Sequence, residues 1–231
     1  MAHQQTLSFG VLLFPEFQLL DAVGPVDFIN SHSRHFLESL NMVPASLIAK
    51  APSIQWHYIS ESMEPVQATS WPPQHPTTTY ENCPKLDYLI IPGPDPRKPL
   101  PEGCAAWLTK IFKNDLKGLL LVCTGSMAVA ASTDILNGFH SATNKMALKM
   151  MASTPHYEIL KKVKWVGDKR WVVDGKVWSA AGITAGIDLA AEFVRRNFDA
   201  EVVEVTKNLA EFKGKPDTPD EFAFLLEGVP L

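Results

Sequence analysis

One cysteine in this sequence stands where chemistry tends to occur. Residues 118–122 (GLLLV) form an apolar run of strand length, and Cys123 follows them directly. The small residues at 127–132 (MAVAAS) then predict a helix. A cysteine between a strand and a helix lies at the helix N-terminus, where backbone N–H groups favour the nucleophilic thiolate. From position alone, a buried core cysteine is an equally good interpretation.

The other two cysteines have no comparable setting. Cys83 precedes a proline in a loop and Cys104 lies near a helix start, so we assign structural roles to both. Three widely spaced cysteines without C-x-x-C argue against a disulfide framework or a zinc site, and a reducing cytoplasm is the simplest compartment. Since no H-x-x-x-H pair stands on an obvious helix, no metal site is predicted.

The elements that must position Cys123 alternate between strands and helices. Apolar runs predict strands at 7–14, 45–51, 53–60, 86–91 and 118–122. Helices are expected from Pro25 onward and at 103–113, 127–132, 184–198 and 200–212, and residues 64–84 form a loop with room for an edge strand. Asp174-Gly175 between two apolar runs predicts a hairpin. This alternation is typical of a mainly parallel, doubly wound α/β sheet with helices on both faces.

The length and charge of the chain limit the classes of function. The 231 residues suit one domain over 1–231, with the polar, Pro-rich segment 213–231 as a loosely held tail on which Phe222, Phe224 and Leu225 could dock. A net charge of −4 without a long basic run argues against nucleic-acid binding. No apolar stretch has the length of a membrane span, and the N-terminus does not have the pattern of a signal peptide.

Five segments occur in the order typical of one superfamily. They are FPEFQLLDAVGPVDFI, DYLIIPG, LLLVCTGS, LNGFHSATN and GKVWSAAGITAGIDLAAEFV. In this order the chain resembles the DJ-1/PfpI superfamily, which is class I glutamine amidotransferase-like, and most resembles its isonitrile hydratase branch. The resemblance implies a flavodoxin-like fold with a nucleophile elbow at Cys123. It also implies a homodimer in the cytoplasm, a small-molecule substrate and no cofactor.

The resemblance further implies which residues surround the nucleophile. Asp21 is expected beside Cys123 and would share protons with it, and Thr124 would contribute a hydroxyl and a backbone N–H. From sequence alone, Asp21 could instead cap a helix opening near Pro25, and Thr124 could only help the next helix to begin. The expected substrate pocket consists of Gly24, Gly93, Gly125, Thr143 and Asn144.

Two positions depart from the pattern of the superfamily. Relatives usually have Pro-Gly-Gly where this chain has Pro92-Gly93-Pro94, and Pro94 has no N–H to donate to an oxyanion. Relatives often have a histidine near position 144, whereas Asn144 can form hydrogen bonds but cannot shuttle protons. Asn144 therefore has either a pocket role or a loop or helix-capping role.

These residues lead to three hypotheses about function. The first, which we favour, is a lyase: a cysteine-dependent hydratase that converts small organic isonitriles to N-substituted formamides, with Cys123 as nucleophile and Asp21 as acid. The second is a non-enzymatic redox or stress sensor that uses the same oxidisable cysteine. The third is a glyoxalase-like or hydrolytic enzyme, which Pro94 and the absence of a histidine after Cys123 disfavour.

Overall fold

The chain forms a central, mainly parallel sheet. The computed structural model describes residues 6–101 and 103–231. Within them, seven strands form one sheet in the order β3-β2-β1-β4-β5-β9-β8. The strands are β1 (Thr6–Leu12), β2 (Ser53–Ser60), β3 (Thr78–Thr79), β4 (Tyr88–Ile91), β5 (Gly118–Val122), β8 (Trp171–Asp174) and β9 (Val177–Ala180). Only the β8–β9 pair is antiparallel, and it is the predicted hairpin, with Gly175 in the left-handed region at φ 57°.

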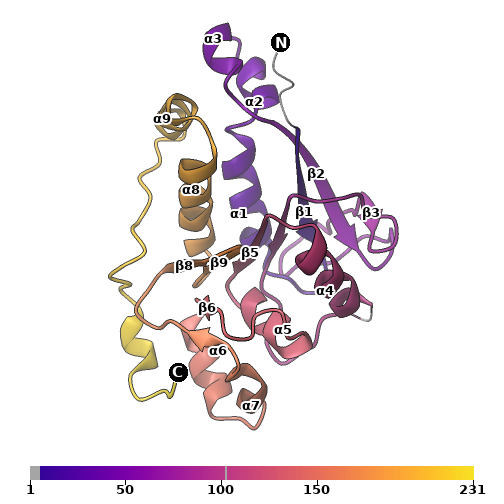
Figure 1. The fold of residues 1–231 in the computed structure, drawn as a ribbon, viewed down its shortest axis with the longest axis vertical. Helices are drawn as coiled ribbons and strands as arrows, with labels where there is room; N and C mark the ends of the chain where they lie inside the picture. Colours follow the sequence, from indigo (N-terminus) through magenta and orange to yellow (C-terminus); the bar gives the residue numbers. More distant parts are fainter. Residues whose placement is uncertain (1–5, 102) are drawn as a thin grey trace.

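Helices cover both faces of this sheet. In Figure 1, α1 (Leu19–Asn30) and α8 (Ala185–Asn197) lie side by side at one face, while α4 (Cys104–Asn114) and α5 (Gly125–Ser132) lie at the other. The predicted α/β fold is thus confirmed. The remaining elements are α2 (Arg34–Ser39), α3 (Ala45–Ile48), α6 (Lys145–Ala152), α7 (Tyr157–Leu160), α9 (Ala200–Leu209), the short strands β6 (His140–Ser141) and β7 (Lys164–Trp165), and a 3-10 helix at Ala223–Leu226.

An aromatic cluster joins α8 to the sheet. Phe193 of α8 contacts Phe9, Tyr88 and Trp178 edge-on, with ring centroids 4.8 to 5.8 Å apart. Gly118 lies next to Tyr88 in the ladder, and a Cβ there would come within 2.9 Å of the Tyr88 ring. The missing side chain of Gly118 therefore leaves room for the cluster that holds the central strands and α8 together.

Two of the predicted elements were wrong. The run at 45–51 is not a strand, because Ala45–Ile48 form the short helix α3 and a turn follows, in which the backbone N–H of Ala51 donates to Ile48 at 3.1 Å. Leu47 and Ala51 are buried while Ala49 between them is exposed, so the alternate burial of a strand is absent. Pro25 does not open α1, which begins six residues earlier at Leu19. Residues buried at 22, 25, 26 and 29 show the helical period that carries α1 through the proline.

The segment 213–231 is held against the body, contrary to the expected loose tail. Asp220 forms a buried ion pair with Lys145 of α6, and the backbone N–H of Lys215 donates to Asp188 at 2.8 Å. Leu226 is the buried apolar residue of this segment, whereas Phe222 and Phe224 are more than half exposed. The segment therefore docks through Asp220 and Leu226 and not through its phenylalanines. None of the described helices is both long and apolar enough to cross a membrane.

The buried Lys145–Asp220 pair should contribute to the free energy of unfolding. Both side chains are at most 3% exposed, so Asp220→Ala would leave the Lys145 ammonium buried without a counter-charge. We expect this variant to lower the free energy of unfolding by about 3–5 kcal/mol in urea titrations. The double variant Lys145→Met/Asp220→Ala removes both charges and should recover most of that loss. Equal losses in the two variants would contradict a role for the pair itself.

Candidate active site

Cys123 lies in a sharp turn between β5 and α5. Its φ of 58° is in the left-handed region, which is unusual for a residue other than glycine. Its backbone N–H donates to Ala181 at 3.0 Å, and the Thr143 hydroxyl donates to its carbonyl at 2.8 Å. Neighbouring elements thus hold the strained residue in place, a pattern found at functional sites.

Glycines allow this turn to approach the loop after β4. A Cβ on Gly125 would lie 2.6 Å from the carbonyl oxygen of Ile91 and 2.9 Å from that of Pro92. A Cβ on Gly93 would lie 2.8 Å from the backbone nitrogen of Thr124 and 2.9 Å from Asp21 Oδ2. The carboxyl ends of β4 and β5 can therefore meet only because both positions lack a side chain.

Three hydrogen-bond donors surround the sulfur of Cys123. They are the backbone N–H groups of Ile183 and Thr124 and the side-chain amide of Asn144, and each lowers the pKa of the thiol. Burial, followed by the charge of Asp21, outweighs them and raises the pKa of Cys123 to about 11. The helix N-terminus alone therefore does not produce the low pKa that the sequence predicted. In the resting site the thiol keeps its proton.

Asp21 is the carboxyl group beside this thiol. It lies in the first turn of α1 and is fully buried, and its Oδ2 accepts a hydrogen bond from the backbone N–H of Gly93 at 2.9 Å. Its Oδ1 is buried and forms no hydrogen bond of ordinary geometry with the described residues. Burial raises the pKa of Asp21 to about 7, although hydrogen bonds from Gly93 and Cys123 lower it. The carboxyl can therefore exchange a proton near neutral pH.

The capping alternative for Asp21 does not agree with these contacts. The residue before α1 is Gln18, and the Asp21 carboxylate bonds to the loop after β4 instead of to the helix. The hydroxyl of Thr124 donates to the carbonyl of Pro94 at 2.6 Å, so it ties the elbow to the same loop. Because the Gly93 N–H is engaged by Asp21 and Pro94 has none, residues 93 and 94 present no free donor to an oxyanion.

Asn144 has both of the roles that the sequence left open, the helix-capping role and the pocket role. Its Oδ1 accepts a hydrogen bond from the backbone N–H of Ala147 at 2.9 Å and so caps α6. The cap fixes the orientation of the amide, and its N–H group is then directed at the sulfur of Cys123. A single asparagine thus begins a helix and donates to the sulfur of Cys123.

An open cleft of about 730 Å³ leads to Cys123. Of the expected site residues, Cys123, Thr124, Gly93 and Asn144 line it. Asp21 and Thr143 form hydrogen bonds with Gly93 and Cys123 of this lining, and Gly125 packs against Ile91 and Pro92 just behind it. The other lining residues are Glu16, Gln18, Gln67, Ala68, Thr69, Pro94, Asp95 and Ile183. Most of these are polar, so the cleft offers many hydrogen-bonding groups around its buried thiol.

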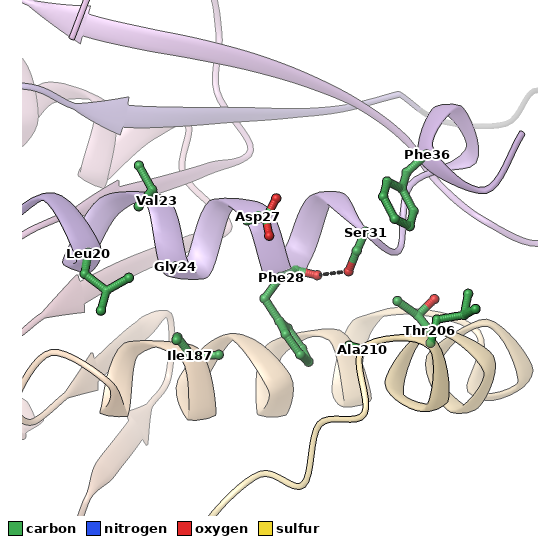
Figure 2. Close-up of a pocket in the computed structure, with 11 residues that line it drawn as sticks. Leu20, Val23, Gly24, Asp27, Phe28, Ser31, Phe36, Ile187, Thr206 and Ala210 are labelled. Carbon is green, nitrogen blue, oxygen red and sulfur yellow. Dashed lines mark hydrogen bonds between the residues drawn. The ribbon is translucent and has the colours of Figure 1, made fainter. Parts of the chain in front are cut away.

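Gly24 lies elsewhere. It packs on Ile187 between α1 and α8 and lines a separate cavity, shown in Figure 2. Sequence reasoning missed Ile183, which has a φ of 22° and whose backbone N–H donates to the sulfur. A signal existed, since Gly182-Ile183-Thr184 follows β9, and β9 lies next to β5 in the sheet. In the described part of the chain, no three His, Cys, Asp or Glu side chains are grouped so that they could hold a metal ion.

Known proteins resemble this chain over most of its length. The sequence pattern of the DJ-1/PfpI family matches residues 9–196. The chain belongs to the DJ-1/PfpI family. An isonitrile hydratase from Pseudomonas putida is 27% identical over 221 residues, covering 92% of this DJ-1/PfpI protein and 84% of the relative.

Solved structures share the fold. A THiJ/PfpI family protein from Pseudomonas syringae superposes with a TM-score of 0.71 at 20% identity, covering 94% of this DJ-1/PfpI protein and 79% of that chain. DJ-1beta from Drosophila melanogaster superposes with a TM-score of 0.67 at 14% identity, covering 90% and 100% of the two chains. These similarities establish the fold of this family member.

The double role of Asn144 gives the first prediction for the site. Asn144→Asp keeps the helix cap, because Asp caps as well as Asn, but it removes the N–H donor and adds a negative charge. We expect alkylation of Cys123 by iodoacetamide to slow by about tenfold or more, with little change in thermal stability. Peptide mapping measures the rate, with Cys83 in the same chain as an internal reference. Asn144→Ser, which caps without a carboxylate, should slow the reaction less.

The pKa of Asp21 predicts a dependence of stability on pH. Because folding raises this pKa from 3.8 to about 7, the folded state holds the proton more tightly, and stability falls as the pH rises from about 4 to 7. That difference corresponds to at most about 4 kcal/mol. Asp21→Asn should therefore stabilise the protein above pH 7 and have little effect near pH 4. Urea unfolding between pH 4 and pH 8 measures the free energy of unfolding of both proteins. In the control variant Asp27→Asn, changed at an exposed position of the same helix, stability should depend on pH as it does in the wild type.

Proposed function

We propose that this protein is a cysteine-dependent hydratase that converts small organic isonitriles to N-substituted formamides. The observation that carries the proposal is the buried pair of Asp21 and Cys123. One carboxyl that exchanges its proton near neutral pH stands beside a protonated thiol. Addition of a thiol to an isonitrile needs a proton acceptor at sulfur and a proton donor at carbon, and Asp21 can act as both in turn. The Pseudomonas putida relative supports this choice of substrate.

The first step adds the S–H group across the terminal carbon of the isonitrile. The Asp21 carboxylate takes the proton from the thiol, and the sulfur forms a bond to the terminal carbon. Asp21 then delivers the proton to that same carbon. The carbon–nitrogen triple bond becomes a double bond, and the product is a thioimidate on Cys123. No oxygen becomes negatively charged, so the missing donor at Pro94 is no obstacle.

The second step releases the formamide. Water adds to the thioimidate carbon, its oxygen forms the new bond, and a proton goes to nitrogen. The carbon–sulfur bond then breaks as the hydroxyl proton passes to Asp21 and on to the departing sulfur. The donors at Ile183, Thr124 and Asn144 stabilise negative charge on that sulfur. One water is consumed, and the enzyme returns to its starting state.

The burial of the thiol makes the redox-sensing alternative less favourable. Peroxides react with accessible thiolates, whereas Cys123 is only 7% exposed and burial raises its pKa to about 11. The position of Pro94 likewise disfavours amide hydrolysis, which forms an oxyanion. The homodimer, the cytoplasmic location and the single-domain organisation expected from the sequence remain predictions of the proposal.

The role of Asp21 is tested by turnover of a small isonitrile. We expect no formamide from Cys123→Ser and a loss of about 10²–10⁴ in rate for Asp21→Asn. In the wild type, kcat/KM should rise with pH through about 7, as Asp21 becomes a base. Removing the neighbouring negative charge should also lower the pKa of Cys123 in Asp21→Asn, measured by thiolate absorbance. Unchanged turnover in Asp21→Asn would rule out the mechanism.

A further inference from the structure

A cavity separate from the cysteine cleft lies between α8, α9 and the segment 212–216. Its volume is about 420 Å³, and it shares no lining residue with the cleft around Cys123. Its apolar wall consists of Phe28, Trp171, Ala191, Val194, Val203 and Phe212. Aromatic walls of this kind pack well against flat or cyclic apolar molecules.

One residue of this lining carries a buried polar atom that has no partner among the described residues. His32 lines the cavity and is fully buried, and its Nδ1–H donates to the carbonyl of Phe28 at 2.8 Å. Since a carbonyl only accepts, this bond fixes the tautomer and leaves Nε2 as an acceptor. Nε2 forms no hydrogen bond with any described residue. Burial lowers the pKa of His32 to about 4, so the ring is neutral at physiological pH and keeps this free lone pair.

Charged groups at the rim are already paired. Glu192 binds Arg195 at 2.6 Å, and Glu204 binds Lys207 at 3.1 Å. The backbone N–H of Lys215 donates to Asp188, which also binds Arg170. A charged ligand would therefore have to break existing pairs, whereas a neutral one would leave them in place.

We propose that this cavity is a binding site for a small neutral molecule with an aromatic or alicyclic body and one O–H or N–H group, which donates to Nε2 of His32. The apolar body would fill the space between α8 and α9, and the donor would satisfy the buried acceptor. This site is independent of the proposed hydratase activity. Its ligand class follows from the aromatic wall, the unpartnered acceptor and the paired rim.

The neighbouring cavity of Figure 2 does not select a ligand with a hydrogen-bond donor. Phe28 lines both cavities and projects from α1 toward α8 in Figure 2. The hydroxyl of Thr206 is also buried there and forms no hydrogen bond with the described residues. A hydroxyl can rotate and either donate or accept, so it does not select a donor as the fixed Nε2 of His32 does.

A matched pair of ligands tests the site by calorimetry. The full chain should bind 2-naphthol saturably and at least about tenfold more tightly than 2-methoxynaphthalene, which has the same rings but no donor. His32→Phe should remove this preference by removing the acceptor. Val203→Trp fills the cavity from α9 and should abolish binding of both compounds.

Leu209→Trp places the same bulky ring on α9 in the neighbouring cavity and should leave binding unchanged. Circular dichroism of each variant serves as the control for folding. If His32→Phe does not fold, the two tryptophan variants still decide the question. Absence of saturable binding, equal affinity of the wild type for both compounds, or unchanged binding in Val203→Trp would each overturn the proposal.

Discussion

The site depends on a carboxyl group buried beside a thiol. A fully buried Asp21 is unfavourable when ionised, and the hydrogen bond from the Gly93 N–H only partly offsets this cost. The remaining penalty raises the pKa of Asp21 toward neutrality, where a carboxyl can both take and give a proton. The same burial keeps the proton on Cys123 at rest. The chemistry therefore arises from the surroundings of the pair, since neither residue has a useful pKa of its own in water.

Several chain segments must converge to maintain this pair. Asp21 comes from α1, its donor comes from the loop after β4, and Cys123 comes from the turn after β5. The glycines at 93 and 125 allow the last two segments to touch, and the Thr124 hydroxyl fastens them together at Pro94. Asn144 and Ile183 then close the site from two other segments. The loops after β4, β5 and β9 meet here because the carboxyl ends of neighbouring parallel strands lie at one edge of the sheet.

Local sequence patterns predicted those parts of the structure that neighbouring residues in the chain determine. The apolar run of β5, the elbow after it and the Asp174-Gly175 hairpin are each visible within about ten residues. The fold class followed from the alternation of elements. Tertiary packing decided the rest. The burial of Leu47 and Ala51 is explained by the residues on which they pack, Leu37 and Val202. The docking of residues 213–231 depends on Lys145, 75 positions away from Asp220.

The pKa of Cys123 shows the same division between local and tertiary effects. The helix N-terminus is a local feature, and by itself it favours a lowered pKa. Burial and the charge of Asp21 are tertiary, and they reverse the direction. The reversal also bears on the type of reaction. A thiol that keeps its proton needs a base next to it, and Asp21 is the carboxyl that interacts with it. The Gly93 N–H that could have stabilised an oxyanion in a hydrolase instead donates to Asp21, the base of the proposed mechanism. The departure at Pro94 is thus consistent with a site that manages protons on a carboxyl–thiol pair and has no need to bind an oxyanion at this loop.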